Sequence, residues 1–410
     1  MADAVAGGEP GGGATRRERL AVVASGVGGL SVLYATQPIL DALAHDLDAS
    51  EAAAAWTIAG STLGVALSAP VAGAVSDRLG RRAVIVWALV GVLATTLLCA
   101  IAPTLSVLVA VRILQGMLVP FVFSTSIAMI PEAWPGSHSV RLGALQVAGT
   151  ALGGFLGRLV AGLAAPLGWQ WSFVAVAVVV AVALGGVVAW LPQDRGFAPS
   201  ATVGAGVRGI GAHLRDGRIL ATCVVGAALL ALQVGSFTYG SLALVAPPHG
   251  LAEWQVSLVF VVFLLAIVVT PRVGAVVARL GLVPTYGIAV AVGIAGLALA
   301  ALGASGATWA IVAGLALTCV AVFAGQSCAT GFVARHASVA RSSAVGLYLT
   351  AYYLGGAAAA VALGPVFAAS GWLGCVVALG IVLALSAPVA ALAWRGSAAG
   401  RASHRVDAGP

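Results

Sequence analysis

Twelve apolar stretches, each about 20 residues long, follow one another along the chain with short polar segments between them. A helix of about 20 residues crosses the ~30 Å hydrocarbon core of a bilayer. The chain is 61% hydrophobic and 8% charged, whereas soluble domains carry about 25% charged residues. We therefore expect an all-α membrane protein with twelve transmembrane helices, since ten-residue barrel alternation is absent. The expected spans are 20–43, 53–76, 83–102, 105–130, 141–165, 170–191, 219–245, 254–277, 284–304, 307–333, 342–369 and 372–394.

The second half of the chain repeats the first. The segment 70–82, PVAGAVSDRLGRR, returns 201 residues later at 271–281 as PRVGAVVARLG. Two shorter pairs recur in the same order, LGG at 152–154 and 354–356, and GW at 168–169 and 371–372. The repeat predicts two pseudo-symmetric six-helix bundles. The expected division is a disordered cytoplasmic tail at 1–15, an N-terminal bundle at 16–191, a cytoplasmic linker at 192–218, a C-terminal bundle at 219–395 and a cytoplasmic tail at 396–410.

The distribution of arginine predicts the orientation in the membrane. All 20 basic residues are arginine, and 17 of them fall on one side if both termini are cytoplasmic. Asp46, Asp48, Glu51 and Glu253 fall on the other side, which agrees with the positive-inside rule. The net charge of +7 therefore indicates topology and not nucleic-acid binding. The 17 residues are Arg16, Arg17, Arg19, Arg78, Arg81, Arg82, Arg141, Arg195, Arg208, Arg215, Arg218, Arg279, Arg335, Arg341, Arg395, Arg401 and Arg405.

The loop after the second span is a candidate gating element. Gly73 would let a neighbouring helix approach closely, Gly80 would permit a tight turn, and Asp77 could pair with a guanidinium or cap a helix. Such a charged latch could form in one conformation and break in another. A plain positive-inside loop is the alternative. The candidate residues are Gly73, Asp77, Arg78, Gly80, Arg81 and Arg82, with Gly274, Arg279 and Gly281 in the second copy.

This loop resembles the one between helices two and three of the major facilitator superfamily. The segment 112–116, RILQG, is similar to that superfamily's Arg-x-x-Gln-Gly element, and the glycine-rich segment 149–158 resembles the fifth helix of its drug:proton antiporter branch. The segments 34–40, 153–158 and 347–355 together resemble the YnfM-like exporter subgroup. The resemblance implies two six-helix bundles around a central cavity that opens alternately to each side. It also implies coupling to the proton gradient.

Three arginines lie inside expected spans. A charge within the bilayer costs a few kcal/mol, so it is normally functional or paired. Arg112 could contact a substrate or proton site, with a helix-packing role as the alternative, and Arg158 could serve the cavity or a gate. Arg272 lies nearer the cytoplasmic face, where snorkelling or latch pairing is expected.

Other polar residues within the spans are candidates for the substrate pathway, with interhelical packing as the competing account. Most lie on spans one, four, five and their counterparts, which line the cavity in the family. No carboxylate lies near the centre of a span, so Asp41 at a span end is the candidate for proton coupling. The pathway candidates are Tyr34, Gln37, Arg112, Gln115, Gln146, Arg158, Gln233, Phe237, Tyr239, Gln326, Tyr348, Tyr352 and Tyr353.

The combined pattern predicts a secondary active transporter of the cell membrane, a proton-coupled exporter of drugs or metabolites that works as a monomer. No Walker-type motif, cofactor site or metal-ligand spacing is present, and the spans hold no histidine or central carboxylate for an intramembrane enzyme. Arginines without a central acid permit anionic, zwitterionic or neutral substrates. An importer or facilitator of a small polar or anionic solute stays open, as does a transport-fold sensor.

Overall fold

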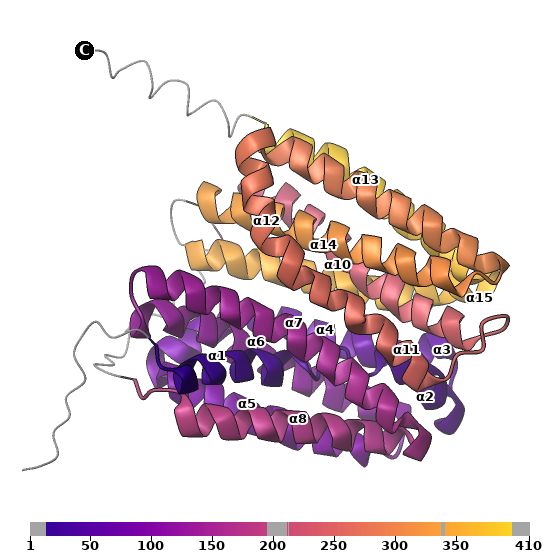
Figure 1. Ribbon diagram of the computed structural model, residues 1–410, viewed down its shortest axis with the longest axis horizontal. Helices are drawn as coiled ribbons and strands as arrows, with labels where there is room; N and C mark the ends of the chain where they lie inside the picture. Colours follow the sequence, from indigo (N-terminus) through magenta and orange to yellow (C-terminus); the bar gives the residue numbers. More distant parts are fainter. Residues whose placement is uncertain (1–13, 195–210, 212, 338–340, 396–410) are drawn as a thin grey trace, which may run out of the picture.

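The computed structural model describes residues 14–194, 211, 213–337 and 341–395; the predictions for 1–13, 195–210 and 396–410 lie outside these residues. The described elements are helical (Figure 1). The first half contains α1 Arg16–Leu30, η1 Gln37–Ile39, α2 Leu40–Asp46, α3 Glu51–Ala54, α4 Trp56–Leu79, α5 Arg81–Ala100, α6 Leu105–Ala133, α7 Ser137–Ala164, η2 Ala165–Leu167 and α8 Trp169–Trp190. The second half contains α10 Gly217–Val245, α11 Glu253–Val259, η3 Phe260–Leu264, α12 Leu265–Leu280, α13 Leu282–Ala301, η4 Leu302–Ser305, α14 Thr308–His336 and α15 Arg341–Trp394.

The helices confirm the prediction of twelve membrane crossings in two bundles. Ten described helices are long and apolar enough to span a membrane. One of them, α15, contains two crossings, because Gly371 has φ 59° and ψ −156° and ends the first of them. The first crossing is not among the ten, because it is divided into helices that are each too short to span a membrane. Counting it brings the number of crossings to twelve.

The first span differs from the continuous helix expected over 20–43. It consists of α1, a series of turns at 31–36, η1 and α2. Pro38 has no N–H and disfavours helical geometry at the residue before it, which favours a break here. Proline alone does not impose one, since Pro120 lies within the continuous helix α6. The corresponding residue of the second half is Gly240, 202 positions later, and α10 runs through it without a break.

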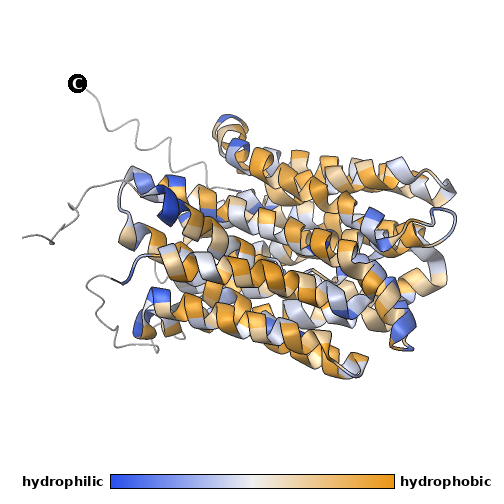
Figure 2. Ribbon diagram, turned by 60° about the horizontal axis from the view of Figure 1, so that its bottom comes forward, coloured by the Kyte–Doolittle hydropathy of each residue, from blue (hydrophilic) through white to orange (hydrophobic). Residues whose placement is uncertain are grey.

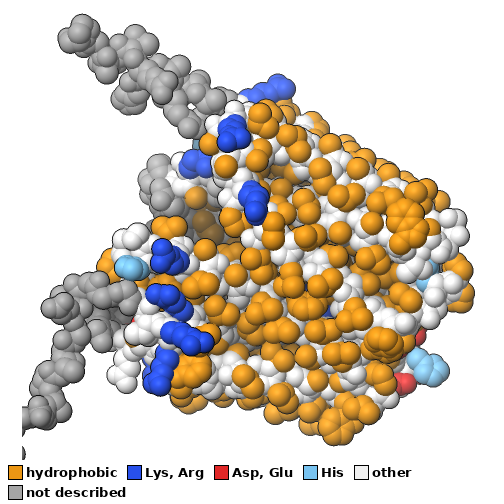
Figure 3. Space-filling view, in the orientation of Figure 1, with side chains coloured by type: hydrophobic (Ala, Val, Ile, Leu, Met, Phe, Trp, Pro, Cys, Tyr) orange, Lys and Arg blue, Asp and Glu red, His pale blue; other side chains and the backbone are white. Residues whose placement is uncertain are grey.

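Charged residues gather at the two ends of the helices and leave an apolar belt between them (Figures 2 and 3). We call the two ends the arginine-rich end and the acidic end. The arginine-rich end carries Arg78, Arg81, Arg82, Arg141, Arg218, Arg279 and Arg335. The acidic end carries Asp41, Asp46, Asp48, Glu51 and Glu253.

Glycines allow backbone contact between helices at equivalent places in the two bundles. A Cβ at Gly153 of α7 would lie 2.6 Å from the carbonyl oxygen of Val27 in α1, and one at Gly157 would lie 1.8 Å from that of Ser31. In the second bundle a Cβ at Gly355 of α15 would lie 2.1 Å from the carbonyl oxygen of Ala227 in α10. The glycine-rich segment 149–158 of the fifth span is thus a line of close backbone contact, or seam, against the first span.

The repeated glycines at the loops have a backbone cause. Gly80 between α4 and α5 has φ 92°, and its copy Gly281 between α12 and α13 has φ 89°. Residues with a Cβ rarely adopt such angles, so glycine is required for these turns. The turn predicted at Gly80 is confirmed.

The bundles share a core at the acidic end. One buried apolar cluster joins acidic-end residues of the first bundle, such as Ile39 and Phe173, to the core of the second. A separate cluster at the arginine-rich end, with Ile85 and Val187, belongs to the first bundle alone. Along one side, α11 and η3 lie against α7 whereas α12 diverges from it (Figure 1). The bundles are therefore closed together at the acidic end.

Gly157→Ala should destabilise the protein by about 1–3 kcal/mol, because the added methyl overlaps a backbone carbonyl that cannot rotate away. The measurement is the thermal unfolding midpoint in detergent. Gly185→Ala is the matched control, since it makes the same change inside α8 where a Cβ meets nothing within 4 Å. Equal midpoints for the two variants would contradict the seam.

Candidate functional site

Arg112 lies at the centre of the first bundle with no exposed surface. Its Nε donates to the carbonyl of Thr57 at 3.1 Å, Nη1 donates to Val32 O at 2.7 Å and to Gln115 Oε1, and Nη2 donates to Leu33 O at 2.6 Å and Ser61 Oγ at 3.0 Å. All five N–H groups of the guanidinium are thus used. Val32 and Leu33 lie in the break of the first span, so Arg112 satisfies carbonyls that the α-helix would otherwise pair.

The rest of the Arg-x-x-Gln-Gly element supports the same contact. Gln115 Nε2 donates to Thr96 Oγ1 at 2.7 Å and so links α6 to α5. A Cβ at Gly116 would lie 2.0 Å from Ser61 O, so glycine allows α6 to touch α4. The element joins the broken span, α4, α5 and α6. This geometry favours the packing alternative for Arg112 and Gln115.

Arg158 lies where the two bundles meet, near the acidic end, and is 2% exposed. Its Nε donates to Gln37 Oε1 at 2.7 Å and its Nη1 to Gly154 O at 2.5 Å. The guanidinium carbon lies 4.7 Å from the ring centre of Tyr34. It also lies 5.0 Å from that of Phe260 and 4.3 Å from that of Phe263, both on η3 of the second bundle. Three of the predicted pathway residues, Tyr34, Gln37 and Arg158, are therefore brought together.

Gln37 connects Arg158 to the second bundle. Its Nε2 donates to Thr238 Oγ1 of α10 at 3.1 Å, and Gln37 and Thr238 are 201 residues apart. The repeat offset is 201–203 residues, so Thr238 is at, or adjacent in sequence to, the position of the second half that corresponds to Gln37. Two nearly equivalent residues can touch only near the twofold axis that relates the bundles. The Gln37 contact therefore closes the space between the bundles on that axis.

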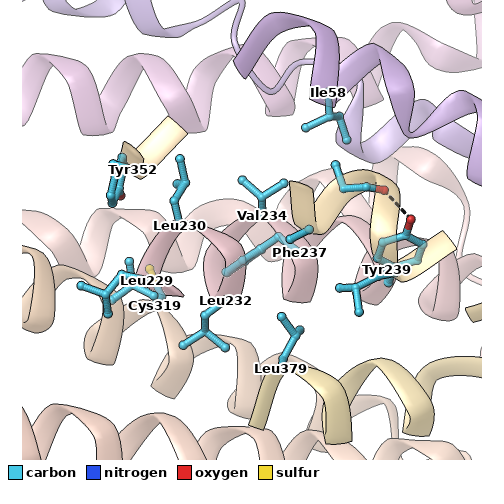
Figure 4. Close-up of a cluster of buried hydrophobic side chains, with 14 of the residues drawn as sticks. Ile58, Leu229, Leu230, Leu232, Val234, Phe237, Tyr239, Cys319, Tyr352 and Leu379 are labelled. Atoms are coloured by element: carbon cyan, nitrogen blue, oxygen red, sulfur yellow. Dashed lines mark hydrogen bonds between the residues drawn. The ribbon is translucent and has the colours of Figure 1, made fainter. Parts of the chain in front are cut away.

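The second bundle makes the corresponding contact with different chemistry. Tyr239 and Ala360 are the copies of Gln37 and Arg158, 202 residues later. Tyr239 Oη donates to the carbonyl of Ala360 at 2.5 Å (Figure 4, dashed line). Both pairs are 121 residues apart. Both bundles therefore have a hydrogen bond between their first and fifth spans, but only the first bundle has an arginine in it.

An aromatic cluster of the second bundle faces Arg158. Phe237 of α10 packs on Phe263 and Phe260, with ring centres 4.6 Å and 5.7 Å apart. Phe323 of α14 meets the edge of Phe263 at 6.3 Å. Cation–π attraction to these rings partly replaces the lost hydration of the buried guanidinium.

The remaining pathway candidates form separate groups. Tyr352 Oη donates to Gln233 Oε1 at 3.5 Å, and its ring stacks on Tyr348 with centres 6.0 Å apart. Gln146 Oε1 accepts from Ser25 Oγ at 3.0 Å in the arginine-rich third of the first bundle. Half-buried Gln326 on α14 belongs to neither group.

Two of these candidates leave buried donors unpaired at equivalent positions. Gln146 Nε2 and Tyr348 Oη have no hydrogen-bond partner among the described residues. The two residues are 202 positions apart, so each is the copy of the other. Buried polar groups are normally hydrogen-bonded, which makes both positions candidates for contact with water or a polar solute.

The candidate gating loop makes its contacts within the first bundle in this conformation. Asp77 pairs with Arg81 at 2.5 Å, and Arg81 also binds Glu132 of α6 at 2.8 Å. No described atom lies within 4 Å of a Cβ placed at Gly73 or Gly274, so the close helix approach expected at Gly73 is not formed. Exposed Arg78 and Arg279 extend from the arginine-rich end.

Arg82 and Asp194 cap each other's helices. The carboxylate oxygens of Asp194 each accept from Arg82 N at 3.2 Å, at the start of α5. The Arg82 side chain donates to Leu191 O at 3.0 Å and Val188 O at 2.8 Å, at the end of α8. Asp194 also lies 2.7 Å from where a Cβ of Gly80 would be. A Cβ at Gly80 would displace this carboxylate, while the positive φ of Gly80 is what requires glycine at the turn.

Two other titratable groups lie at the ends of the helices. Asp41 lines a surface hollow at the acidic end with His45, Asp48 and Glu51, outside the Arg158 cluster. Asp216 has a lowered pKa: desolvation acts to raise it, but hydrogen bonds from the backbone of Ile219 and Arg218 and from His336 outweigh that effect. The described residues contain no cluster of three or more His, Cys, Asp or Glu that could hold a metal ion.

Several contact residues were not singled out from the sequence. Ser61, Thr96 and Thr238 resemble ordinary helix residues, and Phe260 and Phe263 resemble lipid-facing ones. Glu132 and Asp194 were detectable, because each is a carboxylate at the end of the spans where the arginines gather.

Arginine-to-lysine changes should show by their effect on the unfolding midpoint that Arg112 stabilises the fold more than Arg158 and Arg272 do. Arg112→Lys loses at least two of five hydrogen bonds at about 1–3 kcal/mol for each buried group left unpaired, so it should lower the unfolding midpoint most. Arg158→Lys should lower it less, since two bonds are involved. Arg272→Lys is the control, because this exposed side chain makes one bond to Val268 O in its own helix. Equal shifts for Arg112→Lys and Arg272→Lys would refute the role of Arg112.

Known proteins resemble the chain in sequence and in fold. The family model of the Major Facilitator Superfamily matches residues 22–360. The uncharacterized MFS-type transporter YybF of Bacillus subtilis is 28% identical over 368 residues, 88% of this chain and 89% of the relative. The inner membrane transport protein YnfM of Escherichia coli is 27% identical over 377 residues, 90% of this chain and 89% of the relative. The crystal structure of nucleoside transporter NupG superposes with a TM-score of 0.73 at 14% identity, covering 92% of this chain and 100% of that one. The chain belongs to the Major Facilitator Superfamily and is a multi-pass membrane transporter.

Proposed function

We propose that the protein is a secondary active exporter of small molecules that works by alternating access as a monomer. The observation that supports this most is the closure of the acidic end around Arg158, Gln37 and Thr238. The first bundle keeps a core of its own at the arginine-rich end. The first bundle can therefore move as a body about the shared region.

The arginine-rich end faces the cytoplasm of a cell membrane in this proposal, and both termini lie on that side. The segment 192–218 then connects the bundles in the cytoplasm. With that orientation, the observed closure at the acidic end would be closure toward the outside. The Asp77 and Arg81 loop is the candidate latch for the opposite conformation, in which the cytoplasmic ends approach each other.

Proton coupling is the proposed energy source, with Asp41 as the candidate carboxylate. The resemblance to the drug:proton antiporter branch supports it. A second candidate function is an importer or facilitator of a small polar or anionic solute. The observation that favours this candidate is Arg158, a buried cation without an acid partner among the described residues.

In sealed vesicles with an internal pH dye and no imposed gradient, adding a transported solute should change the internal pH. The solutes are pooled amphipathic drugs, sugars and organic acids, and Asp41→Asn should remove the pH change. Solute movement without any pH change in the unaltered protein would contradict proton coupling. Movement that keeps its pH change in Asp41→Asn would exclude Asp41 as the carrier.

Gln37→Ala should shift the population toward opening at the acidic end, because it removes a contact present only in the closed conformation. Spin labels at exposed Leu167 and Leu302 report the acidic end, and labels at exposed Val140 and Leu280 report the arginine-rich end. The first distance should lengthen and the second should shorten.

A label pair within one bundle provides the control. Ile101 and Leu167 are exposed and lie on the first bundle, so their distance should stay constant. The five native cysteines are buried and should not take up label. Unchanged distances for both interbundle pairs would show that the Gln37 contact does not stabilise the closed conformation.

A further inference from the structure

Arg158 has hydrogen-bonding capacity that the protein does not use. Two of its N–H groups are paired, one on Nε and one on Nη1, and Nη2 makes no hydrogen bond to a described residue. Arg112 differs, because all its five donors are paired. No carboxylate within the described residues forms an ion pair with either arginine. Arg158 is therefore a buried cation that has no carboxylate partner and an unused hydrogen-bond donor, Nη2, among the described residues.

The surroundings of Arg158 have a definite geometry. Three aromatic rings lie within 5.0 Å of the guanidinium carbon. The bonds to Gln37 and Gly154 use Nε and one N–H of Nη1, which leaves Nη2 for a further acceptor. Carboxylates and sulfonates are acceptors that guanidinium N–H groups bind well. The site thus offers a cationic edge beside an apolar aromatic wall.

The fold does not need a charge at this position. Its copy is Ala360, whose backbone carbonyl completes the equivalent contact with Tyr239. A buried charge is expensive, so a cation that the helix contact does not require points to a ligand. The two rings of the second bundle that cover Arg158 lie on η3, a 3₁₀ segment inside the span. Such a segment in a helix is a typical hinge, which gives the cover a way to move.

We propose that Arg158 binds the anionic group of an organic substrate that carries a flat apolar body. The anion accepts from the Nη2 edge of Arg158, and the apolar body packs on the aromatic wall formed by Phe237, Phe260, Phe263 and Phe323. Gln37 orients the guanidinium through its bond to Nε. This inference rests on the proposed transport function and names the substrate class of the same site.

Matched pairs of permanently charged and neutral probes test the proposal. Benzenesulfonate, naphthalene-2-sulfonate and biphenyl-4-sulfonate are each compared with the neutral sulfonamide of the same skeleton by equilibrium dialysis against the purified full chain in detergent. Empty micelles provide the background. At least one sulfonate should bind about ten- to a hundredfold more tightly than its sulfonamide, as expected for a charge-assisted hydrogen bond.

Variants locate the preference. Arg158→Gln should abolish it, and Arg158→Lys should retain part of it because the charge stays. Arg272→Gln is the matched control, since it removes an exposed arginine of another span and should leave the preference unchanged. The unfolding midpoint of each variant shows that it is folded. Equal binding of sulfonate and sulfonamide in all three pairs, or a preference that survives in Arg158→Gln, would overturn the anion site.

Flux into proteoliposomes separates this inference from the transport proposal. Sulfonates do not cross bilayers as neutral acids, so their uptake reports the protein. If a sulfonate binds through Arg158 but is not transported into the proteoliposomes, the anion site is supported and its role in transport is contradicted. A neutral or cationic solute moved by a protein without anion preference would leave the transport function standing and overturn the anion site.

Discussion

The packing of the first bundle depends on one requirement: the backbone carbonyl groups at the break in the first span need hydrogen-bond donors. An unpaired carbonyl in an apolar interior costs several kcal/mol, and no water reaches this region of a bilayer. Arg112 supplies the donors from α6, Ser61 of α4 shares Leu33 O with it, and Gly116 allows the two helices to approach. The break, the arginine and the glycine are thus parts of one arrangement.

Duplication explains much of the remaining architecture. The seam of α7 on α1 returns as the seam of α15 on α10, and the turn at Gly80 returns at Gly281 with nearly the same φ. The bundles differ where function is proposed. Pro38 interrupts the first span while Gly240 lets α10 continue, and Arg158 corresponds to Ala360. The helix contacts and turns are thus the same in the two bundles, and the differences at Pro38 and Arg158 lie near the contact between the bundles.

The helix ranges were predictable because each apolar run ends at glycine, proline or charge, and the structure places most boundaries within a few residues of the prediction. The interruption at 31–36 was not predicted, and Pro38 alone could not have shown it, since Pro120 lies in an apolar run that forms the continuous helix α6. The arginines were harder to tell apart. From the sequence, Arg112 and Arg158 are both charges inside spans, and their difference lies in partners such as Val32 and Phe263, which only the packing brings close. The substrate pathway residues remain predictions.

The inequality of positions 158 and 360 has a geometric consequence. A binding region with perfect twofold symmetry would accept any ligand in two equivalent orientations. Here one wall, on the first bundle, carries a guanidinium, and the facing wall carries Phe260 and Phe263. The region therefore has a direction across its axis. If Arg158 binds substrate as proposed, a solute with one charged and one apolar pole would enter in a single orientation. Recognition would then depend on how polarity is distributed within a molecule as well as on its total charge.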